Sequence, residues 1–179
     1  SSNGNQPMVD DILKLTLVFN GTIYNYKSLR SKLIGKGYSF FSHSDTEVII
    51  KAYHYWGEDC VNYLDGMFAF CIWDQPNQKL FIARDRMGIK PLYYNLSNKA
   101  FTFASNSQAL LTQELDKSIN PVALQQQLSL HGVVPAPNTI INGIQKVKPA
   151  TVITINTKGL LKEKTYWHPS ANRSERNLS

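Results

Sequence analysis

Asn20 and Gly21 are the residues whose types and spacing first indicate chemistry in this sequence. They lie in the stretch LVFNGTIYNY (residues 17–26), which is typical of a strand that breaks at an Asn-Gly pair and leads into a helix. Asn offers a carboxamide N–H, and Gly offers a backbone N–H with no Cβ to obstruct a small planar substrate. The pair could therefore stabilise an oxyanion. A β-hairpin turn is the commoner use of an Asn-Gly pair, so the choice depends on the rest of the chain.

The thiols that could act as nucleophiles are Cys60 and Cys71. Cys71 lies in the apolar run 67–73, where burial raises the pKa of a thiol, and Cys60 is expected on a helix packed against a sheet. We interpret both as structural. They form no Cys-x-x-Cys pair, and the sequence shows no apolar leader or membrane-spanning stretch. We therefore predict no metal site, no membrane partner and a reducing, cytoplasmic location.

The composition indicates one globular domain. The chain has 179 residues, of which 42% are hydrophobic, so it can bury a substantial core. The formal net charge of +6 would permit binding to nucleic acid. The Lys and Arg residues are scattered, however, and no run of five basic residues occurs. We therefore predict a solvated basic surface and no nucleic-acid partner.

Short apolar runs separated by turn signals predict an α+β fold with buried antiparallel strands and helices outside them. Residues 1–11 are predicted to be loop, and Asn25 is expected to cap a helix that buries Leu29 and Leu33. Residues 44–47 (SDTE) have the sequence of a capping box for a second helix. Strands are predicted at 13–19, 67–73, 79–83, 91–94, 100–104, 151–155 and 160–167, further helices at 58–64, at 107–111 and from Pro121 onward, and a loop at 133–149.

Five motifs follow one another along the chain: FNGTIYN (19–25), SDTE (44–47), GMFAF (66–70), ARDRMGIKPLYY (83–94) and FAS (103–105). In this order they resemble the glutaminase domain of class II glutamine amidotransferases, and asparagine synthetases in particular. The segments 131–140 and 148–152 further resemble the N-acetylglutaminylglutamine amidotransferase branch. Asparagine synthetases carry a similar Pro-rich loop, so both branches stay open.

The resemblance implies a fold and a set of partners. The fold would be the N-terminal-nucleophile hydrolase architecture, a four-layer αββα sandwich of two antiparallel sheets. Residues 1–167 would form a glutamine amidotransferase domain, and residues 168–179 a tail or linker toward an ATP-dependent synthetase domain. The substrate would be L-glutamine. No cofactor is expected on this part of the chain, because ATP and Mg²⁺ would bind to the synthetase domain; a homo-oligomer is left open.

The resemblance also implies a reaction. In the family, the thiolate of an N-terminal Cys attacks the side-chain amide of glutamine, and the released ammonia amidates an activated carboxylate. This chain has no Met-Cys-Gly start, and residues 6–8 (QPM) resemble a motif that lies further inside the family domain. The expectation is therefore an N-terminally truncated domain that lacks its nucleophile and is inactive alone. The alternative is a non-catalytic binding or regulatory domain from a shortened gene.

The resemblance assigns roles to four residues. Asn20 and Gly21 would form the oxyanion site, and Asp45 would hold the α-ammonium group of glutamine. Asp45 also suits a helix start beside the macrodipole, and that explanation would be preferred without the resemblance. The two roles are compatible, because a carboxylate fixed at a helix start is already oriented toward an amine. Thr22 replaces a Glu that is usual in asparagine synthetases, so weaker or differently arranged binding of the substrate amine is expected.

A charged cluster near the middle of the chain could be a binding site or a structural ion-pair network. Arg84, Asp85, Arg86 and Lys90 could suggest a phosphate or nucleic-acid site. In the family pattern they are interpreted as a buried or partly buried ion-pair network that fixes the turn between two strands. The segment 34–37 (IGKG) is too short for a phosphate-binding loop.

Overall fold

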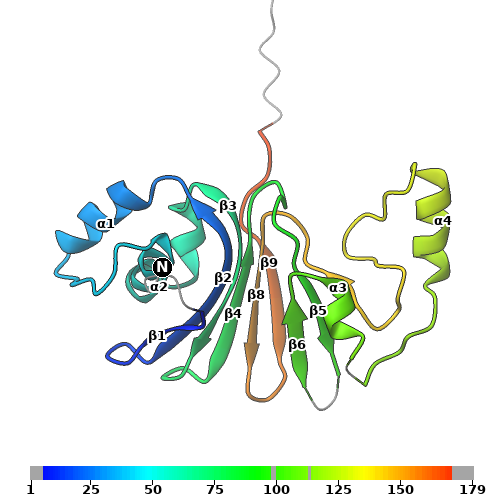
Figure 1. Cartoon of the computed structure of the whole chain (residues 1–179), viewed down its shortest axis with the longest axis horizontal. Helices are drawn as coiled ribbons and strands as arrows, with labels where there is room; N and C mark the ends of the chain where they lie inside the picture. The colour runs from blue at the N-terminus through cyan, green and yellow to red at the C-terminus, as the bar shows by residue number, and fades with distance from the viewer. Residues whose placement is uncertain (1–5, 98–99, 113, 171–179) are drawn as a thin grey trace, which may run out of the picture.

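Two antiparallel sheets dominate the computed structural model, which describes residues 6–97, 100–112 and 114–170 (Figure 1). Sheet A has the strand order β1-β2-β3-β4-β8-β9, and sheet B has the order β6-β5-β7. Sheet A contains β1 (Met8–Asp10), β2 (Leu15–Ile23), β3 (Gly66–Asp74), β4 (Lys79–Arg84), β8 (Thr151–Asn156) and β9 (Leu161–Thr165). Sheet B contains β5 (Tyr93–Leu96), β6 (Phe101–Ala104) and β7 (Gln145–Lys146).

Helices lie on the outer sides of these sheets. The helices α1 (Tyr26–Ile34) and α2 (Asp45–Trp56) cover one face of sheet A, and a 3₁₀ helix over Gly57–Asn62 follows them (Figure 1). The short helix α3 (Ser107–Leu110) contacts β5 and β6, whereas α4 (Pro121–Ser129) lies apart from both sheets. Within the described ranges, no helix has the length and apolar content needed to cross a membrane. The fold is α+β, as predicted.

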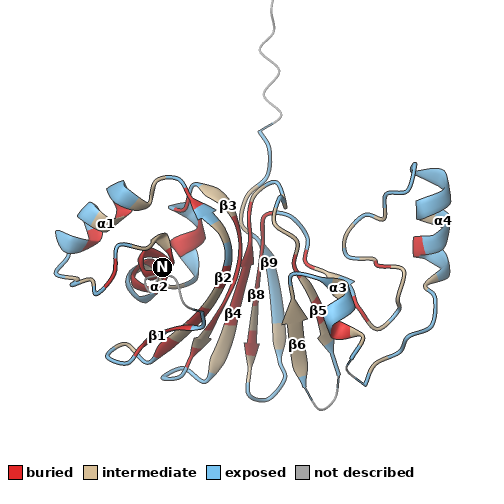
Figure 2. Ribbon diagram, in the orientation of Figure 1, coloured by how far each residue is buried: buried red, intermediate tan, exposed pale blue. Residues whose placement is uncertain are grey.

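Strand alternation divides the apolar core into two clusters. In β2, Phe19 packs with the helices while Val18 faces sheet B. In β3, Phe70 belongs to the helix side and Cys71 to the space between the sheets. Burial is concentrated in the central strands of sheet A (Figure 2). This confirms the prediction that the apolar run 67–73 is a strand buried on both faces.

The predictions for the N-terminal region were wrong in two places. Residues 8–10 are not loop, because they pair with Leu15–Leu17 and form β1. The Asn-Gly pair does not break the first strand, because β2 remains paired with β3 as far as Ile23. Long-range pairing therefore overrides the local turn tendency of Asn-Gly.

The predicted helix caps were correct only in part. Asn25 precedes α1, but its side chain donates to the Tyr63 carbonyl at 2.9 Å instead of capping the helix. Ser44 caps α2 by accepting from the Thr46 N–H at 3.0 Å. Glu47 does not complete a capping box, because it accepts from the backbone N–H groups of residues 41 and 42 at 2.9 and 2.7 Å. Glu47 therefore orders the loop before α2.

Most other expectations agree with the structure. Leu29 and Leu33 are buried, and Pro121 lies in the first turn of α4. The remaining predicted strands are found with ends displaced by one or two residues. The predicted loop 133–149 contains the short strand β7. In the predicted tail, residues 168–170 form no helix or strand, and the rest lies outside the described residues.

A buried ion pair joins β1 to α2. The Lys51 ammonium lies 2.5 Å from the Asp10 carboxylate and 3.9 Å from Glu47, and all three side chains are nearly inaccessible. Burial alone would raise the pKa of Asp10, but Lys51 and the N–H groups of Leu13 and Ile12 lower it below 3.8. The ion pair therefore stabilises the fold fully at pH values above the ordinary Asp pKa of 3.8. Its contribution is lost as the pH falls and Asp10 becomes protonated in the folded state.

Replacing Lys51 by Met should destabilise the fold by about 3 kcal/mol, because it leaves two buried carboxylates without their cation. The free energy of unfolding in urea measures the loss. Lys148→Met is the matched control, because the Lys148–Glu163 pair at 2.9 Å is exposed and should change stability by less than about 1 kcal/mol. Equal losses in the two variants would contradict this account of the buried pair.

Candidate functional site

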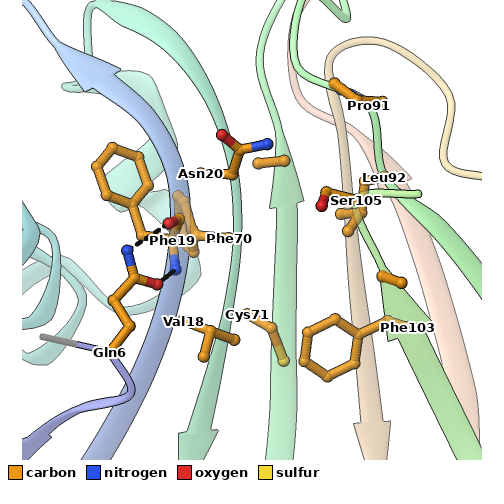
Figure 3. Close-up of a pocket in the computed structure, with 12 residues that line it drawn as sticks. Gln6, Val18, Phe19, Asn20, Phe70, Cys71, Pro91, Leu92, Phe103 and Ser105 are labelled. Carbon is orange, nitrogen blue, oxygen red and sulfur yellow. Dashed lines mark hydrogen bonds between the residues drawn. The ribbon is translucent and has the colours of Figure 1, made fainter. Parts of the chain in front are cut away.

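A cavity of about 170 Å³ opens between the two sheets beside β2 (Figure 3). Its polar lining includes the side chains of Gln6, Asn20 and Ser105. Asn20 shares a strand face with Val18, which also lines the cavity, because side chains alternate along a strand. The structure therefore places the predicted oxyanion residue Asn20 in a cavity wall.

The side chain of Gln6 continues the pairing of β1 with β2. Its carboxamide Nε2 donates to the Phe19 carbonyl at 2.6 Å, and its Oε1 accepts from the Phe19 N–H at 2.7 Å (Figure 3). These are the two bonds that a strand residue opposite Phe19 would make. This role of Gln6 could not be predicted from the sequence, because its partner is 13 residues away and no local pattern reveals the pairing.

Gly21 directs its backbone N–H away from β3. Its partner across the ladder is Phe68, whose N–H donates to the Asp85 carboxylate and whose carbonyl accepts from the Asp85 N–H. Both backbone groups of Phe68 therefore point toward β4. In an antiparallel ladder, the residue opposite must then point its own N–H and carbonyl toward the other side.

The outer edge of β2 consequently has one open position between two occupied ones. At Phe19 the N–H is bound by Gln6, and at Ile23 the N–H donates to the Asp45 carboxylate at 3.0 Å. Gly21 lies between them on the same edge. Among the residues that the structure describes, its N–H has no hydrogen-bond partner. A ligand oxygen at this edge could accept from it.

Only glycine fits at position 21. A Cβ there would lie 2.1 Å from the Met67 carbonyl oxygen and 2.8 Å from the Phe68 Cα, and the φ angle is +150°. A Cβ at Gly66 on the facing strand would lie 2.2 Å from the Thr22 carbonyl oxygen. The two strands thus approach each other too closely for side chains at this point.

Asp45 is held beside this edge and does not line the cavity that contains Asn20. It is the first residue of α2, and its Oδ2 accepts from the Ile23 N–H. Its Oδ1 has a longer contact of 3.4 Å with the Ser44 hydroxyl, so it can accept from a bound cation. Thr22 is exposed and shares the strand face of Asn20.

The geometry gives the site two chemically different ends. Asn20 and Gly21 are adjacent and offer N–H donors that could bind one developing oxyanion. Asp45 is held by the N–H of Ile23, which lies two residues after Gly21 along β2. This spacing corresponds to roughly 7 Å. Such a site suits a small molecule with a polar carbonyl at one end and an amine at the other.

Neither cysteine can serve as the nucleophile. Burial raises the pKa of the Cys60 thiol far above neutrality, and burial raises that of Cys71 to about 12. Cys71 lines the cavity but is only 2% exposed. Both therefore remain thiols at neutral pH, which supports their interpretation as structural. Within the described ranges, no cluster of His, Cys, Asp and Glu could hold a metal ion.

The cluster around Arg84 fixes the turn after β4, but through the backbone. Arg84 donates to the carbonyls of Lys90 at 2.8 Å and Gly88 at 2.7 Å, and also to that of Val147. The predicted ion-pair network is wrong, because the described residues contain no ion pair of Arg84 or Asp85. The Asp85 carboxylate accepts from the N–H groups of Phe68, Met87, Ile89 and Lys90.

Comparison with known proteins finds consistent similarity. The family model described as "Glutamine amidotransferase domain" matches residues 1–167. The glutamine-hydrolysing asparagine synthetase 1 of Bacillus subtilis is 42% identical over 165 residues, which are 92% of this chain and 26% of that protein. Asparagine synthetase 3 of the same organism is 38% identical over 147 residues, or 81% of this chain and 24% of that protein. The chain thus spans about a quarter of these relatives.

Solved structures show the same fold. The glutamine phosphoribosylpyrophosphate amidotransferase of B. subtilis superposes with a TM-score of 0.64 and 21% identity, covering 92% of this chain and 32% of that one. An allosteric regulatory enzyme of purine biosynthesis gives a TM-score of 0.66, also at 21% identity, with 93% and 32% coverage. At this identity, the likeness concerns the fold alone.

Gly21→Ala should destabilise the fold by about 3 kcal/mol or more, because the methyl group would overlap the backbone of β3. Urea unfolding monitored by circular dichroism measures the effect. Gly159→Ala is the control: its φ is also positive (+74°), but no atom lies within 4 Å of the added Cβ. That variant should lose only about 1–2 kcal/mol, and a similar loss at both positions would disprove the close approach.

Proposed function

Because this chain belongs to the glutamine amidotransferase domain family, we propose that it is the glutamine-hydrolysing part of an ATP-dependent, asparagine synthetase-like amidotransferase. The observation that carries the proposal is the Gly21 N–H, which has no partner among the described residues, follows Asn20 in the strand and lies two residues from the Asp45-bound Ile23. This arrangement can receive both ends of L-glutamine. The activity of the whole protein, including its synthetase reaction, is part of the proposal.

In the proposed reaction, a thiolate attacks the side-chain amide carbon of glutamine, and the carbonyl oxygen becomes an oxyanion. Asn20 and Gly21 donate N–H groups to that oxygen, while Asp45 accepts from the substrate α-ammonium. The C–N bond then breaks as the nitrogen takes up the proton that the thiol gave up, ammonia leaves, and water hydrolyses the thioester to glutamate and the free thiol. The thiolate must come from outside the described residues, because Cys60 and Cys71 are buried.

Further parts of the proposal concern the whole protein. Residues 1–167 would form a four-layer αββα sandwich of the N-terminal-nucleophile type, which is supported by the helix-covered sheet A facing sheet B. ATP and Mg²⁺ would bind to a synthetase domain that uses the ammonia. Either aspartate or an N-acetylglutaminylglutamine-like carboxylate would be amidated, and the segments 131–140 and 148–152 favour the second branch.

Asn20→Ala in the full-length enzyme should lower glutamine hydrolysis by about 10²–10³-fold, because one oxyanion donor is lost. Amidation driven by added ammonia should be unchanged, since it bypasses the glutaminase site. The two rates are measured by glutamate release and product formation. Asn62→Ala, at an exposed Asn outside the site, serves as the control. Unchanged hydrolysis in Asn20→Ala would refute the assigned role.

Thr22→Glu should lower the KM for glutamine roughly fivefold, because a carboxylate adds about 1 kcal/mol of charge-assisted binding to the substrate amine. Steady-state glutaminase kinetics of the full-length enzyme measure this value. Thr22→Gln is the matched control, because it has the same size without the charge and should improve KM little. An equal or higher KM in Thr22→Glu would argue against the missing-carboxylate explanation.

A further inference from the structure

The segment from Ser118 to Gln145 contains no Asp, Glu, Lys or Arg. At the chain's average of 18% charged residues, about five would be expected in a stretch of this length. The segment includes α4 and the loops on either side of it. Depletion of charge is a property of interface centres and is unusual for a solvent-exposed helix.

Exposed apolar side chains are concentrated in the same segment. Within α4, only Ala123 is buried, and Leu128 is 79% exposed. Leu124 and Leu128 are one turn apart and therefore share a helix face. Figure 2 shows α4 as mostly exposed. Six large apolar residues form what we name the α4 surface: Ile119, Val122, Leu124, Leu128, Leu130 and Val133.

The helix is nevertheless held in a defined position. Asn120 caps it by accepting from the N–H groups of Val122 and Ala123. The Asn120 N–H donates to the Ile140 carbonyl at 2.8 Å, and Asn138 donates to the Gln126 side chain at 3.2 Å. α4 is thus anchored from its loop side, while its apolar residues remain exposed. An anchored, uncharged apolar surface is typical of a docking site.

We propose that the α4 surface docks against the synthetase domain of the same polypeptide, an inference that rests on the proposed function. The 165 matched residues are 26% of the first relative, which is therefore about three and a half times as long as this chain, and a whole protein of that length would have a large further part to cover the surface. In Figure 1, β9 leads the described chain to the upper end of the sheets, and α4 lies at that same end. A covalently linked domain is also favoured over a second copy by its high effective concentration.

Site-specific thiol labelling of the full-length protein tests this interface without relying on activity. Leu128→Cys should react at least tenfold more slowly than Ile12→Cys, whose position is 87% exposed on the β1–β2 turn. Peptide mapping separates these thiols from the native ones. Equal labelling rates would overturn the proposal. So would protection that disappears on dilution, or a photocrosslink from position 128 to a second copy, because the occupant would then be another molecule.

A second variant connects the interface to ammonia use. Leu128→Glu should reduce the product formed per glutamine hydrolysed several-fold while leaving glutaminase kcat unchanged, and Ile12→Glu should change neither. If the wild-type protein hydrolyses no glutamine, the proposed function fails, yet the labelling result still decides the docking surface. Full coupling in Leu128→Glu, together with an accessible thiol at position 128, would contradict the docking proposal.

Discussion

The site depends on the close approach of β2 and β3 at Gly21 and Gly66. Neither position has room for a Cβ, since each would place one about 2 Å from a carbonyl oxygen of the facing strand. This contact fixes the register in which Gly21 lies opposite Phe68, and Asp85 holds both backbone groups of Phe68 on the β4 side. The Gly21 N–H must then face the outer edge. A steric constraint between two backbones therefore determines the direction of a hydrogen-bond donor.

Around this edge, polar side chains take the place of strand and loop partners. Gln6 pairs with Phe19, Asp45 with Ile23, and Arg84 and Asp85 bind the backbone of the turn after β4. Charged groups that bind backbone dipoles avoid the desolvation penalty of an unpaired charge and also fix loop geometry. This explains why an Arg-Asp-rich turn, expected to contain ion pairs, instead forms a rigid support for the strands beside the site.

Features that depend on local apolar patterns could be predicted from the sequence. The strand β3 followed from its continuous apolar run, and Leu29 and Leu33 from their helical spacing. Features that depend on distant partners could not. The strand β1 has three residues and forms because Leu15–Leu17 pair with it, and Gln6 has its role only because Phe19 is opposite. For Asn20, Gly21 and Asp45, residue types and spacing alone favoured a turn and a helix start, and only the family resemblance favoured their roles in a site.

The pairing of Gln6 with Phe19 limits how this region can change during evolution. Met8 must remain opposite Leu17 while Gln6 reaches Phe19, so the spacing between the two is set by the sheet. Inserting or deleting one residue there would turn Met8 out of the core and separate Gln6 from its partner. The connection at residues 11–14 is outside this pairing and largely exposed. Homologous sequences should therefore accumulate length variation in residues 11–14. They should contain no insertion or deletion in residues 6–8.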